Sequence, residues 1–150
     1  MSKGQKQILL DTNLLVYLYI KDFPRKKIVK RLIDQWCKKG IDLFLTEQSL
    51  LEFYSVITDH RRVKKPVTFG VAQKEIAKYY QNSIFKIICP TASTFAIFLR
   101  IITHRKIKGA KIFDFYLAAT ALSNGVETIY TENDRNFKKI KGLRVVNPFI

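Results

Sequence analysis

Three carboxylates of the chain lie within strongly apolar sequence. Asp11 follows the apolar run 8–10, Glu52 lies inside residues 50–54, and Asp114 lies inside residues 112–116. A carboxylate drawn into apolar surroundings loses hydration, which raises its pKa and costs several kcal/mol unless a cation or hydrogen bonds compensate. A divalent cation would also relieve the repulsion among the three acids. Oxygen ligands without His or Cys favour Mg²⁺ or Mn²⁺ over Zn²⁺.

Each of these acids also has an ordinary structural interpretation. Asp11 could cap a helix that begins at Thr12, which is a common role for Asp. Glu52 could occupy an exposed position between two apolar stripes or pair with a buried arginine. Asp114 could lie in the first turn of its helix, where a negative charge interacts favourably with the helix macrodipole.

Other catalytic chemistries lack support in the sequence. His60 and His104 lie in basic loop sequence, and no Ser or Cys occupies a nucleophile setting such as GxSxG. The chain has only six glycines and no glycine-rich phosphate-binding motif. Cys37 and Cys89 form no CxxC pair and are expected to be core residues of a protein in a reducing compartment.

Hydrophobic periodicity predicts strands that alternate with helices. Strands are expected at residues 8–10, 41–45, 84–89, 128–131 and 143–146. Helices are expected from Thr12 or Asn13, over 25–39, from the N-cap Thr46 to Thr58, over about 68–81, from Thr91 or Ser93 to 102, and over 112–122. Residues 60–65 are expected to form a loop. This alternation predicts one α/β domain spanning residues 1–150, with a mainly parallel sheet of about five strands covered on both faces.

In such a sheet the active crevice lies beyond the carboxyl ends of the strands, where the winding direction reverses. Asp11 is expected there, at the end of the first strand. The group Glu132, Asn133 and Asp134 follows the carboxyl end of a later strand, although acids are routine in turns. Both groups would face one crevice if the two strands are neighbours.

The charge balance predicts a polyanionic partner. The 150 residues include 27 Lys and Arg against 12 Asp and Glu, for a formal net charge of +15, and the basic residues are distributed along the chain rather than gathered in a tail. A merely solubilising surface is the alternative, and a lipid partner is disfavoured because no long amphipathic basic helix is present. No apolar run approaches about 18 residues and no signal peptide is evident, so a cytoplasmic protein without membrane spans is expected.

The order of short motifs resembles PIN-domain proteins. The motifs are Ile-Leu-Leu-Asp-Thr-Asn at 8–13, Leu-Leu-Glu-Phe at 50–53, Gly-Ala-Lys-Ile-Phe-Asp-Phe-Tyr-Leu-Ala-Ala-Thr-Ala-Leu at 109–122, Thr-Glu-Asn at 131–133 with Phe137, and Arg-Val-Val-Asn-Pro-Phe at 144–149. Together they cover nearly the whole chain, whose length is similar to that of single-domain VapC-like toxins. The resemblance implies a three-layer α/β/α fold and a metal-dependent endoribonuclease, often dimeric and often inhibited by a small antitoxin protein.

The resemblance also implies roles for the acids. Asp11 matches the family's first acid and Asp114 its later helical acid, so these two are expected to be the principal Mg²⁺ or Mn²⁺ ligands. Glu52 matches the central helical Glu, which completes the acidic cluster or positions a water molecule.

Two positions depart from the family's pattern. A further family acid corresponds to Asn133, and adjacent Asp134 or preceding Glu132 could substitute for it, which makes Asn133 and Asp134 additional candidate ligands. The acid expected just before Phe137 is Asn136.

The leading hypothesis is therefore metal-assisted hydrolysis of RNA phosphodiester bonds by the toxin of a toxin-antitoxin pair. Basic loop residues would follow the RNA backbone, and the candidates are Arg61, Arg62, Arg105, Lys106 and Arg135. One alternative is an RNA-binding or protein-binding module that keeps the fold without an effective catalytic site. Another is a nuclease that acts on DNA flaps.

Overall fold

The computed structural model, which describes residues 7–20 and 24–150, is built around a five-stranded parallel sheet with the order β3-β2-β1-β4-β5. The strands are β1 (Gln7–Leu10), β2 (Asp42–Thr46), β3 (Phe85–Ile88), β4 (Thr128–Tyr130) and β5 (Arg144–Val146). Each of the five predicted strands is present within two residues of its expected bounds, and all pairings are parallel.

The helices connect the strands as the apolar periodicity predicts. They are α1 (Thr12–Tyr19), α2 (Pro24–Lys38), α3 (Glu47–Ile57), α4 (Phe69–Gln81), α5 (Thr94–Ile102), α6 (Ile112–Ser123) and α7 (Asp134–Phe137), with a short 3-10 turn η2 (Gly109–Lys111) before α6. Thr46 caps α3 as predicted, because its side chain accepts a hydrogen bond from the Ser49 backbone N–H. No helix was predicted for the single turn α7, which lies between β4 and β5.

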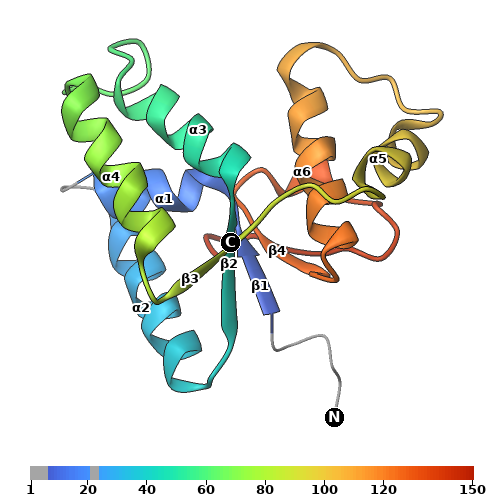
Figure 1. The fold of residues 1–150 in the computed structure, drawn as a ribbon, viewed down its shortest axis with the longest axis horizontal. Coiled ribbons are helices and arrows are strands. Elements are labelled where there is room, and N and C mark those ends of the chain that lie inside the picture. Colours follow the sequence, from blue (N-terminus) through green and yellow to red (C-terminus); the bar gives the residue numbers. More distant parts are fainter. Residues whose placement is uncertain (1–6, 21–23) are drawn as a thin grey trace.

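The strands divide their side chains between two cores, one on each face of the sheet. In β1, Ile8 and Leu10 pack with residues of α1 to α4, whereas Leu9 packs with α5, α6 and α7. Figure 1 shows these two groups of helices on opposite sides of the strands. The predicted three-layer α/β/α architecture is confirmed, and its sheet is covered on both faces as parallel sheets require.

The winding direction reverses between β1 and β4. β1 pairs with β2 on one side and with β4 on the other, where Leu10 is the register partner of Tyr130. The Asp11 backbone N–H continues this ladder by donating to the Tyr130 carbonyl at 3.1 Å. The carboxyl ends of β1 and β4 are therefore adjacent, which was a condition for one shared crevice.

The prediction that both cysteines lie in the core is wrong, because Cys37 and Cys89 are both exposed. Cys37 follows buried Trp36 on α2, and successive helical residues point about 100° apart, so its side chain leaves the core-facing stripe. Cys89 lies just beyond the edge strand β3, where its thiol donates a hydrogen bond to a Glu47 carboxylate oxygen 3.1 Å away. Among the described residues, no helix is long and apolar enough to cross a membrane.

Candidate functional site: an acidic cleft at the carboxyl edge of the sheet

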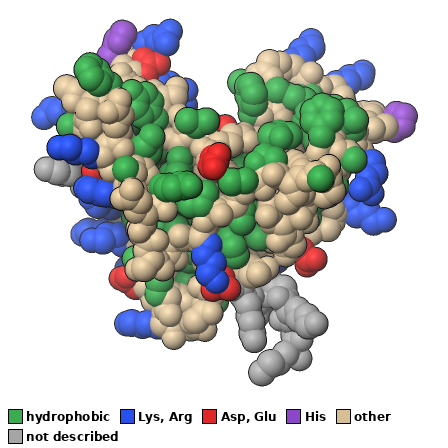
Figure 2. Space-filling model, in the orientation of Figure 1, with side chains coloured by type: hydrophobic (Ala, Val, Ile, Leu, Met, Phe, Trp, Pro, Cys, Tyr) green, Lys and Arg blue, Asp and Glu red, His purple; other side chains and the backbone are tan. Residues whose placement is uncertain are grey.

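A cleft of about 610 Å³ lies beyond the carboxyl end of β1, between the α1 and α3 wall and the first turn of α6. Figure 2 shows a hollow between the two lobes of the molecule that carry these walls. Asp11, Glu52 and Asp114 all line it, although they are 41 and 62 positions apart in the sequence. The fold therefore brings the three acids singled out by their apolar surroundings into one cavity.

Asp11 is the most buried of these acids, with only 4% of its surface exposed. It is the N-cap of α1, where Oδ1 accepts from the Thr12 backbone N–H at 2.7 Å and Oδ2 accepts from the Thr131 hydroxyl at 2.7 Å. Burial raises the pKa of Asp11 to about 6, and repulsion from Asp114 and Glu52 adds to this, while the two hydrogen bonds act in the opposite direction. The capping interpretation is thus correct, but it leaves a carboxylate that is costly to ionise.

Glu52 lies half-buried on α3 and is connected to Asp11 through Thr12. The Thr12 hydroxyl donates to Glu52 Oε2 at 3.0 Å, while the Thr12 backbone N–H donates to Asp11 Oδ1. Gln48, one helical turn earlier, donates from Nε2 to Glu52 Oε1 at 3.0 Å. Neither sequence-based alternative for Glu52 describes it, since it is not fully exposed and its hydrogen bonds come from a hydroxyl and an amide.

Asp114 lies in the first turn of α6, which is also the position expected for a macrodipole partner. Its Oδ2 accepts a hydrogen bond from Asn136 Nδ2 at 2.8 Å. Burial raises the pKa of Asp114, and the charge of Glu52 raises it further, whereas the Asn136 bond and the Lys111 ammonium lower it. Asn136 therefore orients Asp114 with a neutral amide at the position where the family resemblance leads one to expect an acid.

Gln48 joins the two walls of the cleft, a role that the sequence did not reveal. Its Nε2 donates to Glu52 and also to the Phe113 carbonyl of α6 at 2.9 Å. These two acceptors fix the amide orientation, because the reversed amide would place oxygen against oxygen. In this orientation Oε1 is buried with no hydrogen-bond partner in the described part of the chain.

The candidates for a fourth acid occupy different surroundings. Asn133 lines the cleft. The Glu132 carboxylate accepts a hydrogen bond from Tyr17 and forms an ion pair with Arg25. Asp134 accepts from Asn147 and pairs with Lys138 at 3.0 Å, and the Lys138 bond in particular lowers the pKa of Asp134.

Glu132 and Asp134 therefore do not line the cleft, although Tyr17, which donates to Glu132, does. The structure gives Asn133 the position that faces the cavity.

The candidate RNA-contacting cations are also separated by the fold. Arg62 lines the cleft, as does Lys111, which is not among the predicted RNA-contacting residues. Arg61 pairs with Asp59, and Arg105 donates to two backbone carbonyls and lies over the Phe115 ring. Lys106 and Arg135 are exposed but do not line the cavity.

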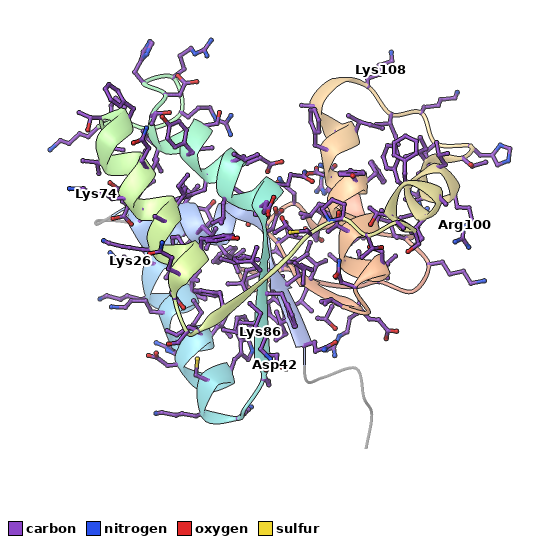
Figure 3. The ribbon with its side chains drawn as sticks, viewed as in Figure 1. Lys26, Asp42, Lys74, Lys86, Arg100 and Lys108 are labelled. Carbon is purple, nitrogen blue, oxygen red and sulfur yellow. The ribbon has the colours of Figure 1, made fainter. Side chains whose placement is uncertain are left out.

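Much of the remaining positive charge faces away from the cleft. Figure 3 labels Lys26, Lys74, Arg100 and Lys108, and all four point outward from the lobes rather than into the hollow between them. These four cations therefore lie away from the cleft, whose lining includes Arg62 and Lys111.

The donor chemistry of the cleft suits a hard divalent cation. Its carboxylates present oxygen atoms, and no His or Cys lines the cavity. Within the described ranges, no three His, Cys, Asp or Glu side chains are close enough to form a preformed metal-binding cluster. The mutual repulsion that raises the pKa of Asp11 nevertheless would be relieved by a cation between the acids.

The family comparison covers most of the chain, with the PIN-domain model matching residues 8–143. A search of curated proteins gives no match. Among solved structures, FitAcB from Neisseria gonorrhoeae has a TM-score of 0.68 and 22% identity over 95% of this chain and 98% of that chain.

Two further similar structures come from other organisms. VapBC-1 from nontypeable Haemophilus influenzae has a TM-score of 0.69 and 16% identity, covering 96% of this chain and 99% of that chain. VapC20 from Mycobacterium tuberculosis, described as a sarcin-ricin loop cleaving toxin, has a TM-score of 0.60 and 16% identity. The match covers 81% of this chain and 86% of that chain. At these identities the similarity establishes a shared fold.

Proposed function

The chain belongs to the PIN-domain family, and from this premise we propose that it is a metal-dependent endoribonuclease that hydrolyses RNA phosphodiester bonds. The observation that carries the proposal is the convergence of Asp11, Glu52 and Asp114 on one cleft at the switch point of the sheet. The positive surface supports a polyanionic substrate, since 27 basic residues oppose 12 acidic ones.

Asp11 and Asp114 are the proposed principal ligands of Mg²⁺ or Mn²⁺, with Glu52 completing the site. When bound, such an ion supplies a Lewis acid for a phosphate oxygen and lowers the pKa of an attacking water. Thr12 and Thr131 hold the Asp11 carboxylate in one orientation, and Asn136 does the same for Asp114. Glu52 accepts two hydrogen bonds, and a carboxylate has about four acceptor positions, so it retains capacity to orient a water molecule.

We further propose that the chain is the toxin of a toxin-antitoxin pair. The similar structures include FitAcB, VapBC-1 and a toxin-antitoxin complex from Klebsiella pneumoniae. A small antitoxin protein, a homodimeric state and a cytoplasmic RNA substrate follow from this assignment as proposals. Co-purification with the product of a neighbouring gene and sedimentation analysis would test the first two.

The nuclease proposal is tested by incubating the purified protein with labelled structured RNAs in Mn²⁺, Mg²⁺ or EDTA. Discrete cuts are expected with either metal and none with EDTA. Asp11→Asn should abolish the cuts, whereas Asp34→Asn, which makes the same change on the exposed face of α2, should leave them intact. Equal cleavage by the wild type in EDTA, or by Asp11→Asn in metal, would refute the proposal.

A non-catalytic binding module is the second candidate, favoured by the two amides near the acids. Asn133 faces the cleft and Asn136 donates to Asp114, so neither position adds negative charge for a metal ion. The two candidates differ in a binding measurement: a ligand that binds the folded state must stabilise it, so Mn²⁺ should raise the Tm of the nuclease but not of the module.

A further inference from the structure

An exposed phenylalanine lines the acidic cleft. Phe113 has 56% of its surface exposed, whereas Phe115 on the same helix has 7% exposed and belongs to the core. An aromatic ring at this exposure contributes little to folding, because the area it removes from water is small. Its position in the cavity provides a flat apolar surface next to the acids.

The ring is attached to a rigidly held part of the backbone. The Phe113 carbonyl accepts the Gln48 amide at 2.9 Å, which ties the first turn of α6 to α3. Asp114 is the next residue, and it is itself held by Asn136. The ring and the carboxylate are therefore anchored to the same turn, and a group resting on the ring would lie beside the acidic site.

Two cations line the same cleft as the ring. Lys111 comes from the turn that leads into α6, and Arg62 comes from the loop after α3, so they reach the cleft from opposite walls. Neither takes part in an ion pair within the described residues. A cleft that contains both an exposed aromatic ring and cations is a combination that binds unpaired nucleotides, because the ring stacks on the base and the cations attract the backbone phosphates.

We infer that Phe113, Lys111 and Arg62 form a subsite for one unpaired nucleotide of the substrate, with its base against the Phe113 ring and the flanking phosphates near the two cations. The inference rests on the proposed nuclease function and deepens it by assigning the residues that would hold a substrate nucleotide beside the acids. A base inside a duplex is already stacked on both faces and cannot use the ring. Every base has a π-face, so this contact selects unpaired structure rather than a particular base.

The test is the affinity of a fluorescein-labelled unpaired RNA oligonucleotide, measured by anisotropy in EDTA so that metal-dependent cleavage cannot occur. Phe113→Ala should weaken binding by about tenfold, the order of loss seen when a stacking aromatic is removed. Phe113→Trp should retain the affinity. Phe95→Ala is the matched control, because that ring is 59% exposed on α5 and does not line the cleft.

A second measurement separates stacking from general electrostatic attraction. The wild type should prefer the unpaired oligonucleotide over the same sequence in a duplex, and Phe113→Ala should lose most of this preference. Lys111→Ala should weaken binding to both forms and reduce the dependence of affinity on salt concentration.

The inference and the proposed function can fail separately. Wild-type affinity and duplex discrimination in Phe113→Ala would overturn the subsite, as would an equal loss in Phe95→Ala. A change in oligomeric state on sedimentation with unchanged RNA affinity would also overturn it, by assigning the ring to a protein contact. The absence of metal-dependent cleavage by the wild type, with the expected binding differences preserved, would refute only the nuclease.

Discussion

Replacing Asp11 with Asn should stabilise the metal-free protein at neutral pH while removing its activity. The Asp11 pKa is raised to about 6 from the ordinary value of 3.8, chiefly by burial. Each pH unit between these values corresponds to about 1.4 kcal/mol, so keeping this carboxylate ionised costs the folded state about 3 kcal/mol at pH 7. Asn removes that cost and remains a good N-cap, although it weakens the bond with Thr131. The expected net gain in the free energy of unfolding is about 1–3 kcal/mol.

The pH dependence of this gain has a definite sign. A folded-state pKa above the unfolded one means that the folded protein binds the proton more tightly, so Asp11 favours folding fully below about pH 3.8 and loses this contribution as the pH rises to about 6. Urea denaturation in EDTA at pH 4, 5, 6, 7 and 8 measures it. The difference between Asp11→Asn and the wild type should be small at pH 4 and reach its full size above pH 6.

Asp34→Asn serves as the control for this experiment, because it removes one negative charge from an exposed position. Its free energy of unfolding should follow that of the wild type across the range within about 0.5 kcal/mol. A loss of stability in Asp11→Asn at pH 7, or a difference from the wild type that does not change with pH, would refute the view that Asp11 is an ionised, desolvated acid.

Three further substitutions probe the cleft. Gln48→Ala removes the bonds that join the two walls, so it should lower the free energy of unfolding by about 1–2 kcal/mol, measured by urea denaturation, and reduce kcat by releasing Glu52. Asn136→Ala removes a hydrogen bond that lowers the Asp114 pKa. Because metal binding needs the deprotonated carboxylate, the increase in Tm on adding Mn²⁺ should require a higher pH in this variant than in the wild type. Glu132→Gln should keep the Mn²⁺-induced increase in Tm, because that carboxylate is already bound by Tyr17 and Arg25 and does not line the cleft. Loss of the increase would instead identify Glu132 as a ligand.

The sequence predicted the elements well because their signals are local. The helix α2 has an apolar stripe at helical spacing, and α3 begins at a Thr that caps it, so short-range rules were sufficient. The turn α7 was not predicted because a single turn has too few residues to display a helical period. The positions of the two cysteines differ from the prediction because apolar neighbours in the sequence need not be apolar neighbours in space.

The site was partly predictable for a similar reason. Asp11, Glu52 and Asp114 were recognisable because each interrupts an apolar run, which an ordinary surface acid does not do. Their meeting in one cleft depended on the adjacency of β1 and β4, which no local pattern specifies. Gln48 gave no signal, because its function lies in a hydrogen bond to a carbonyl 65 residues away and a Gln on a helix is unremarkable.

RNA cleavage should depend on a divalent cation that these acids bind. The most direct measurement titrates Mn²⁺ into the wild type and Asp114→Asn, following bound Mn²⁺ by electron paramagnetic resonance and RNA cleavage in the same samples. The wild type should reach half-maximal binding and half-maximal cleavage at the same free Mn²⁺ concentration, and Asp114→Asn should bind more weakly and cleave little. Cleavage that persists without bound Mn²⁺, or that is undiminished in Asp114→Asn, would contradict the claim.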